Sequence, residues 1–127
     1  MTALKKVLVA EDSSVIQNLT KKILQFQNFD IFAAKNGEEV MSMIKNEDFD
    51  IVLMDINMPK KDGMECAKEI RALDDQKKSE IPILAITGNA MNYSMDDFKG
   101  VGINDFLPKP LNFDHLVEMV KKYTSSD

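Results

Sequence analysis

A short apolar run that ends at a carboxylate restricts the folds open to this chain. Residues 51–54 read Ile-Val-Leu-Met, Asp55 follows them, and Pro59 comes four positions later. A continuous apolar run of this length is typical of a strand buried on both faces, and a proline hinders its continuation. Ligand sites of open parallel sheets lie at the carboxyl ends of such strands. Asp55 is therefore the first candidate functional residue, although an aspartate there could simply end a strand and begin a turn.

Short apolar runs alternate along the chain with segments of helical periodicity. We expect strands at 7–10, 29–34, 51–54, 83–86 and 104–107. Helices are predicted from five sets of apolar residues at helical spacing: Ile16, Leu19, Ile23 and Phe26; Val40, Met41 and Ile44; Ala67, Ile70 and Leu73; Met91, Met95 and Phe98; Phe113, Leu116, Val117 and Val120. We expect residues 74–80 to form a polar connection, the fourth helix to be short and mobile, and residues 123–127 to fray.

Five alternations of strand and helix predict right-handed parallel crossovers, with helices on both faces of one sheet. The expected fold class is α/β, a three-layer α/β/α sandwich with a five-stranded parallel sheet and five helices. Acidic residues follow both the first and the third strand, and they share one site only if these strands are neighbours. The flavodoxin-like order 2-1-3-4-5 satisfies this condition. With 127 residues, the chain is expected to be one domain, 1–127, without an output domain.

Composition excludes several classes of function. The net charge of -5 leaves no basic stripe for nucleic acid, and no apolar run approaches the roughly 18 residues of a membrane span. No secretion signal is recognisable at the start, so we expect a cytoplasmic protein. Cys66, the only cysteine, lies at an apolar helical spacing and is interpreted as core filler. His115, the only histidine, is interpreted as an exposed helix residue.

Five polar residues follow or end four different predicted strands: Glu11, Asp12, Asp55, Thr87 and Lys109. Because the carboxyl ends of parallel strands open onto one edge of the sheet, these side chains should gather there. Three carboxylates so close together repel one another unless a cation relieves them. Mg²⁺ prefers oxygen ligands and keeps several waters, so this set suits it, whereas the lack of a His or Cys cluster argues against zinc.

Thr87 and Lys109 add a hydroxyl and an ammonium group to the same predicted edge. These are groups that can hold the oxygens of a transferring phosphoryl group, a reaction that depends mainly on positioning and charge neutralisation. Asp55 would then be the nucleophile that forms an aspartyl phosphate. Read singly, Thr87 could be only a strand end and Lys109 only a surface lysine. Glu11 and Asp12 could likewise be a solvated pair at a helix start.

Taken in order, the motifs resemble a known family. They are Glu11-Asp12 after the first strand, Met54-Asp55 with Met58-Pro59 and Asp62-Gly63 after the third, Thr87 after the fourth and Lys109-Pro110 after the fifth. The chain resembles a response-regulator receiver domain of the CheY-like superfamily along essentially its whole length. The resemblance implies a phosphoryl group accepted on Asp55 from a phosphohistidine of a sensor kinase or a histidine phosphotransfer protein. It also implies a cis peptide bond at Lys109-Pro110.

The resemblance further implies a metal site and a switch. Mg²⁺, with Mn²⁺ or Ca²⁺ as substitutes, would be bound by Glu11, Asp12, Asp55 and the backbone carbonyl of Asn57. Thr87 would turn toward the phosphoryl group and the aromatic residue Phe106 would move inward behind it. This would alter the face formed by the fourth helix, the fifth strand and the fifth helix, where a downstream protein would bind. Phe106 lacks the hydroxyl of the tyrosine often found there, so packing must carry the signal.

Other functions remain as alternatives. Slow self-dephosphorylation is the only enzymology expected of a receiver, and Asn57 and Asn89 would set the lifetime of its phosphate. A haloacid-dehalogenase-like phosphatase also forms an aspartyl phosphate, but it needs an aspartate two residues further on, where this chain has Asn57. A flavin carrier of the same topology would need a loop after the first strand that accepts a phosphate, and Glu11-Asp12 would repel a phosphate there. A receiver that is never phosphorylated is disfavoured, because every required residue is present.

The sequence leaves the partners open. The chain could be a stand-alone regulator or the receiver portion of a hybrid histidine kinase. It could be a monomer or a dimer that forms on phosphorylation. We expect no direct contact with nucleic acid or with a membrane.

Overall fold

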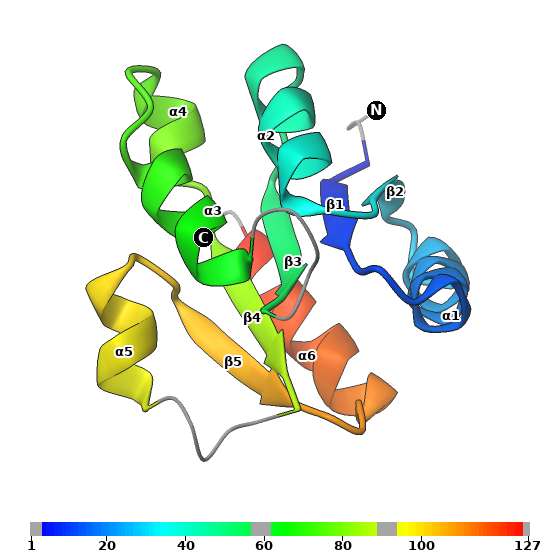
Figure 1. Ribbon diagram of the computed structural model, residues 1–127. Coiled ribbons are helices and arrows are strands. Elements are labelled where there is room, and N and C mark those ends of the chain that lie inside the picture. The colour runs from blue at the N-terminus through cyan, green and yellow to red at the C-terminus, as the bar shows by residue number, and fades with distance from the viewer. Residues whose placement is uncertain (1–3, 57–61, 89–93, 126–127) are drawn as a thin grey trace.

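The chain folds into a parallel sheet of five strands with helices packed on both faces (Figure 1). The structure is a computed structural model, and it describes residues 4–56, 62–88 and 94–125. The strand order is β2-β1-β3-β4-β5, and every neighbouring pair is parallel. The predicted α/β class and the order 2-1-3-4-5 are both confirmed, so β1 and β3 lie side by side.

The five strands are short and begin and end close to the predicted positions. They are β1 (Lys6–Ala10), β2 (Asp30–Ala34), β3 (Ile51–Asp55), β4 (Ile83–Thr87) and β5 (Asp105–Pro108). All five residues of β3 and of β4 are buried, as expected for central strands covered on both faces. The strand that the sequence placed at the centre of the fold is therefore a central strand of the sheet.

Six helices are present in the described parts of the chain, one more than expected. They are α1 (Ser14–Phe26), α2 (Gly37–Asn46), α3 (Gly63–Arg71), α4 (Gln76–Ser79), α5 (Met95–Gly100) and α6 (Phe113–Thr124). The additional helix is α4, a single turn within the predicted polar connection. Asp75 caps it by accepting hydrogen bonds from two backbone N–H groups, and no α4 residue is buried, so apolar spacing could not reveal it. The predicted fourth and fifth helices correspond to α5 and α6.

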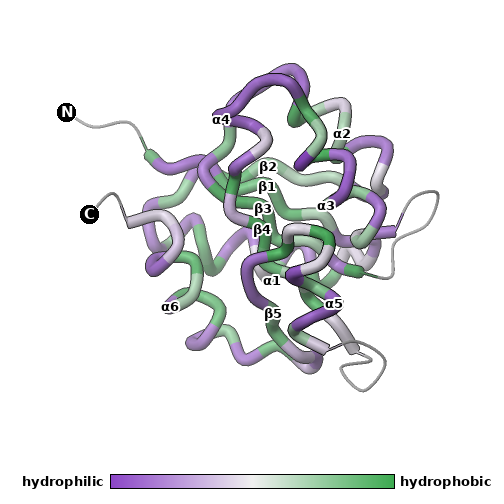
Figure 2. The backbone as a smooth tube through the Cα atoms, turned by 90° about the vertical axis from the view of Figure 1, so that its left-hand side faces the viewer, coloured by the Kyte–Doolittle hydropathy of each residue, from purple (hydrophilic) through white to green (hydrophobic). Residues whose placement is uncertain are grey.

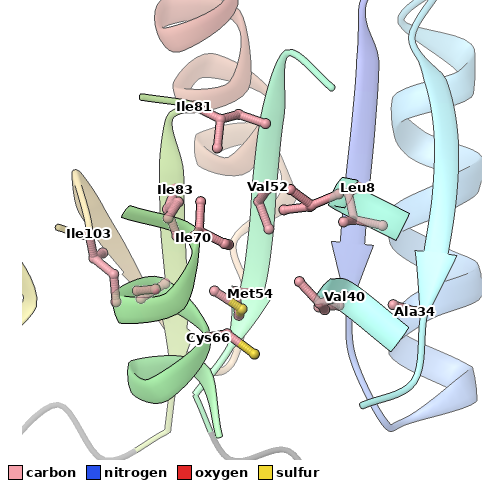
Figure 3. Close-up of a cluster of buried hydrophobic side chains, with 14 of the residues drawn as sticks. Leu8, Ala34, Val40, Val52, Met54, Cys66, Ile70, Ile81, Ile83 and Ile103 are labelled. Atoms are coloured by element: carbon pink, nitrogen blue, oxygen red, sulfur yellow. The ribbon is translucent and has the colours of Figure 1, made fainter. Parts of the chain in front are cut away.

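Two apolar layers lie on opposite faces of the sheet. One face carries α2, α3 and α5, and the other carries α1 and α6; alternate residues of each strand point to one face or the other. Figure 3 shows the first layer, in which strand residues Leu8, Val52 and Ile83 meet Val40 of α2 and Ile70 of α3. In Figure 2 the apolar strands run through the middle of the molecule between more polar helices. Cys66 is buried in this layer, as predicted.

Helix α1 does not bury the face that the sequence predicted. Phe26 is 85% exposed and Leu19 is 45% exposed, whereas the buried residues of α1 are Gln17, Thr20 and Leu24. The helix is thus turned by about one residue from the expected orientation, and a polar pair of side chains faces the sheet. The reason lies in the hydrogen bonds that Gln17 makes to carbonyls at the strand ends.

The last helix extends further than predicted, as far as Thr124. Helix α6 includes Tyr123 and Thr124, which were expected to fray. The Tyr123 hydroxyl lies 3.2 Å from a carboxylate oxygen of Asp105, and Thr124 is buried and donates to the Val120 carbonyl. The contact of Tyr123 with Asp105 joins α6 to the start of β5, whereas that of Thr124 lies within α6. None of the helices in the described residues is long and apolar enough to cross a membrane.

Candidate functional site

Four strands deliver polar side chains to one edge of the sheet. Glu11 directly follows β1, Asp55 is the last residue of β3, Thr87 is the last residue of β4, and Lys109 directly follows β5. The pairing of β3 with both β1 and β4 places Asp55 in the middle of this edge. The structure therefore brings together the side chains that the sequence placed at strand ends.

Three carboxylates form the centre of the site. One oxygen from each of Glu11, Asp12 and Asp55 lies within 4.8 Å of the other two. Glu11 and Asp55 are each only 1% exposed, whereas Asp12 is exposed. Charged groups are costly to bury without compensation, so this cluster requires a positive charge or bound protons.

Lys109 supplies part of that positive charge. Its Nζ lies 3.1 Å from Oδ2 of Asp55 and 4.0 Å from Oε2 of Glu11. The backbone N–H of Lys109 donates to the Thr87 carbonyl, 2.9 Å away, so the lysine is anchored at the end of β4. The following bond, Lys109-Pro110, is cis, as the family resemblance implied. One ammonium group is nevertheless shared by two buried carboxylates.

Lys109 alone does not compensate for the burial of the Glu11 carboxyl group, and the pKa of Glu11 is therefore raised. Burial, together with the neighbouring Asp55 carboxyl, raises the pKa of Glu11 from 4.5 to about 7, although the Ser13 N–H and Lys109 act in the opposite direction. Oε1 of Glu11 accepts a hydrogen bond from the Ser13 N–H at 3.1 Å. Its other oxygen, Oε2, is buried and has no hydrogen-bond partner in the described parts of the chain. A buried carboxylate oxygen of this kind is an available ligand.

The donor set fits a hard divalent cation. All three acidic residues offer oxygen, and no histidine or sulfur ligand belongs to the group. Mg²⁺ binds through a small number of carboxylates and retains water at its other positions, which suits a site with one exposed and two buried acids. The fit rests on the unsatisfied Oε2 of Glu11 and on the closeness of the three oxygens.

Thr87 and Phe106, the two residues of the predicted switch, lie in neighbouring strands. Thr87 is buried at the end of β4. Phe106, in the next strand, is partly buried, and its ring stacks on that of Phe98 with the centroids 5.4 Å apart. Phe98 is fully buried and belongs to α5, so the two rings connect β5 with that helix. Asn57 and Asn89 lie outside the described residues.

Gly63 supports the site because its lack of a side chain lets α3 pack closely against the end of β3. A Cβ atom at this position would lie 2.9 Å from the Ile56 side chain and 3.0 Å from the Asp55 carbonyl oxygen. The first residue of α3 therefore approaches the end of β3 more closely than a side chain allows. Asp62 before it caps α3 by accepting from the Glu65 N–H at 2.9 Å. The Asp62-Gly63 pair thus has a structural role at the start of α3.

Comparison with known proteins decides the family. The family model described as response regulator receiver domain matches residues 7–121. The chain belongs to the response regulator receiver domain family. Hybrid signal transduction histidine kinase I of Dictyostelium discoideum is 37% identical to this receiver over 121 residues, which cover 91% of this chain and 7% of that protein.

Solved structures agree with this assignment. The receiver domain of a sensor histidine kinase from Pseudomonas aeruginosa, with a magnesium ion in its active-site cleft, is 27% identical and has a TM-score of 0.87 over 98% of this chain and all of that chain. A response regulator of Thermotoga maritima in complex with Mg²⁺ and BeF is 34% identical, with a TM-score of 0.82 over 94% of this chain and 99% of that one.

This receiver corresponds to a small part of its curated relatives. It spans between 5% and 17% of the lengths of five curated relatives from Dictyostelium discoideum, Vibrio cholerae and Pseudomonas syringae. Four of these relatives are hybrid or sensor kinases by name, and the fifth is named as a sensor protein.

Proposed function

We propose that this receiver accepts a phosphoryl group on Asp55 and passes the signal on by a change of shape. The observation that carries the proposal is the Asp55 carboxylate, which is buried at the centre of the site, with the Lys109 ammonium 3.1 Å away. A carboxylate in this position can act as a nucleophile, while the lysine neutralises charge on an incoming phosphoryl oxygen. The donor would be a phosphohistidine of a sensor kinase or of a histidine phosphotransfer protein.

In the proposed transfer, one oxygen of Asp55 forms a bond to phosphorus as the bond between phosphorus and the donor imidazole nitrogen breaks. The electron pair of the broken bond stays on that nitrogen, so the products are an acyl phosphate and a histidine side chain. Lys109 and Thr87 would hold two of the phosphoryl oxygens. Thr87 ends β4, which adjoins β3, and Lys109 follows β5, the strand beyond β4, which supports this assignment.

Glu11, Asp12 and Asp55, with the Asn57 carbonyl, would bind Mg²⁺, and Mn²⁺ or Ca²⁺ would substitute. When bound, the cation would neutralise the carboxylates and the phosphoryl oxygens, which is the main requirement of phosphoryl transfer. The buried Oε2 of Glu11 and the closeness of the three carboxylate oxygens support this assignment. Asp55 is thus proposed both as a ligand and as the phosphoacceptor.

The signal would leave the site through Thr87 and Phe106. A Thr87 hydroxyl that turns toward the phosphoryl group vacates space behind it, and Phe106 would move into that space. Because Phe106 stacks on Phe98 of α5, this movement must change the packing of α5. A downstream protein would recognise the altered face of α5, β5 and α6. A complete shift from 1:99 to 99:1 requires about 5.5 kcal/mol of differential binding, so we expect partial switching.

The phosphodonor would approach from the side of α1. A groove of about 230 Å³ lies there, lined by Ile16, Leu19, Lys109, Pro110, Leu111 and Phe113. The groove is mainly apolar and includes Lys109, whose Nζ contacts Asp55. A helical histidine protein with an apolar face could cover this groove and present its phosphohistidine to Asp55. The groove includes the start of α6, at Phe113, but no residue of α5 or β5.

Asn57 and Asn89 would govern how long the phosphate persists. Neither side chain is a strong base, so self-dephosphorylation would be slow, and the receiver is proposed to act as a switch rather than as a turnover enzyme. We propose a cytoplasmic location, because kinases that phosphorylate a histidine need ATP. A receiver of this kind could be a stand-alone regulator or a portion of a hybrid kinase, as a monomer or as a dimer that forms on phosphorylation.

Incubation with Mg²⁺ and acetyl phosphate tests the proposal. Intact-mass measurement should show one added phosphoryl group on the wild type and none on Asp55→Asn. Asp62→Asn is a matched control, because it makes the same chemical change at an exposed residue, and asparagine caps a helix as well as aspartate does. The proposal fails if the wild type gains no phosphoryl group or if Asp55→Asn still gains one. Steady release of phosphate from a phosphomonoester would favour the phosphatase alternative instead.

A further inference from the structure

Gln17 of α1 is a polar residue in a place where hydrocarbon would be expected. Its side chain is only 8% exposed. Its amide nitrogen, Nε2, donates to the main-chain carbonyls of Glu11, at 3.1 Å, and of Ala34, at 3.0 Å. A primary amide has two N–H groups, so both are used. Because burial of an unpaired amide is costly, these two carbonyls explain why α1 turns this side chain toward the sheet.

The first of these carbonyls belongs to the acidic site. The Glu11 carbonyl is part of the peptide group that joins Glu11 to Asp12. The orientation of this group determines the directions in which the side chains of Glu11 and Asp12 point. The N–H of Glu11 donates to the Ala34 carbonyl at 3.0 Å. Glu11 is therefore held on one side by the end of β2 and on the other by Gln17.

Loss of the Gln17 amide would affect these two carbonyls differently. The Ala34 carbonyl would keep its hydrogen bond from the Glu11 N–H. The Glu11 carbonyl would lose the hydrogen bond from Gln17, and a buried carbonyl without a partner is unfavourable. Rotation of the Glu11-Asp12 peptide toward water would relieve that cost, and the same rotation would move both carboxylates away from Asp55.

We propose that Gln17 is a positioning residue for the cation site, fixing the Glu11-Asp12 peptide so that both carboxylates meet Asp55. This inference rests on the proposed function, since it assigns Gln17 to the site that holds the cation. Outer-shell partners of metal ligands commonly alter metal affinity by 10–100-fold. Gln17 acts through the main chain rather than on a carboxylate, so we expect the lower end of that range.

The test compares Mg²⁺ binding by two variants of the full chain in calorimetry. Gln17→Met keeps the length of the side chain and removes the amide, and its Mg²⁺ affinity should fall about tenfold. The Mg²⁺ concentration that gives half-maximal phosphorylation by acetyl phosphate should rise by the same factor. The rate of phosphorylation at saturating Mg²⁺ should be largely unchanged. Thr20→Val is the control, because Thr20 is also buried on α1 but donates only to the Ile16 carbonyl of its own helix. Its Mg²⁺ affinity should equal that of the wild type.

A second measurement needs no variant. If the Gln17 hydrogen bonds favour Mg²⁺ binding, Mg²⁺ must in turn favour those hydrogen bonds. Exchange of the Gln17 side-chain amide protons with solvent, followed by NMR, should therefore slow when Mg²⁺ is added to the wild type. An unchanged exchange rate overturns the inference, as does a Gln17→Met variant with wild-type Mg²⁺ affinity or a Thr20→Val variant with the same loss. A wild type that binds no Mg²⁺ overturns the proposed function as well.

Discussion

At the scale of single residues, Glu11 is a carboxyl group whose burial has a high electrostatic cost. Its carboxyl is buried beside Asp55, with one lysine near both, and its pKa is raised to about 7. In the metal-free protein the folded state therefore binds a proton more tightly than the unfolded state does. Stability from this proton is fully present below pH 4.5 and is lost as the pH rises through about 7.

Replacement of Glu11 by glutamine should remove this pH dependence. Between pH 4.5 and 7, metal-free wild type should lose stability relative to Glu11→Gln, with each unit of pKa shift worth about 1.4 kcal/mol. Mg²⁺ should raise the stability of the wild type more than that of the variant, because the cation pairs with the ionised Glu11 carboxylate. Urea unfolding at both pH values, with and without Mg²⁺, measures these differences. Parallel pH profiles for the two proteins would contradict the prediction.

The sequence was sufficient to predict the side chains that come together at this edge. Glu11, Asp55, Thr87 and Lys109 each follow or end a strand, and the topology of a parallel sheet brings strand ends together whatever their spacing in the chain. Gln17 could not be found in this way, because its role depends on which face α1 buries. The apolar spacing of Ile16, Leu19 and Ile23 indicated a different face. A glutamine six residues after the acidic residue was the only signal, and it is weak alone.

At the scale of helices and strands, Arg71 joins α3 to the turn before β5. Its Nε and Nη2 donate to the Gly102 carbonyl at 2.9 and 2.6 Å, and Nη1 donates to the Ser79 carbonyl at 2.7 Å. Nη2 also donates to the side chain of Asn104. Gly102 has a φ of 90°, and a Cβ there would lie 2.5 Å from Cγ of Arg71. The turn is therefore fitted to the arginine.

Gly102→Ala should destabilise the fold by about 1–3 kcal/mol, because alanine is strained at a positive φ and its methyl group would collide with Arg71. Gly100→Ala is the control: nothing lies within 4 Å of a Cβ there, and the residue ends α5. It should be neutral or stabilising by up to about 1 kcal/mol. Urea unfolding followed by circular dichroism measures both. An equal loss in the two variants would show that the fit to Arg71 is unimportant.

Helix α5 is the element that the proposed switch should loosen. Among its described residues only Phe98 is buried, whereas α3 buries Gly63, Cys66, Ala67 and Ile70. Movement of Phe106 away from Phe98 therefore removes a large part of the packing that holds α5. Hydrogen exchange with and without beryllofluoride and Mg²⁺ should change more in α5 and β5 than in α3. A change that is largest in α3 would be inconsistent with a signal carried by the two rings.

The elements themselves were predictable to different degrees. Strands such as β3 and β4 are continuous apolar runs because both faces are covered, so their positions were evident. Helix α4 was missed because it buries nothing and is held by its cap at Asp75. The order of Tyr123 and Thr124 was missed because it depends on contacts with Asp105 and within α6 that spacing does not show.

At the scale of the whole molecule, two surfaces have separate proposed tasks. The groove beside α1 contains Lys109, whose Nζ contacts the proposed phosphoacceptor Asp55, whereas α5, β5 and α6 form the proposed output face. Leu19 and Phe26 are exposed apolar residues of α1, and Leu19 also lines the groove. A partner that delivers a phosphoryl group gains from covering such a surface, because it excludes water and aligns its histidine with Asp55.

Leu19→Glu should separate protein-mediated phosphorylation from the chemistry of Asp55. Leu19 lines the groove and is nearly half exposed, so a carboxylate there should leave the fold intact but oppose an apolar partner. Transfer from a phosphorylated histidine phosphotransfer protein should slow about tenfold or more, since one charge placed in a docking surface typically costs over 1 kcal/mol. Phosphorylation by acetyl phosphate, which is too small to use the groove, should be unchanged.

The control is Gln25→Glu, which adds the same charge at an exposed position of α1 outside the groove. This variant should accept the phosphoryl group from the phosphotransfer protein at the wild-type rate. If both variants slow equally, net charge rather than docking explains the effect. If Leu19→Glu also loses the reaction with acetyl phosphate, the substitution has reached the site itself.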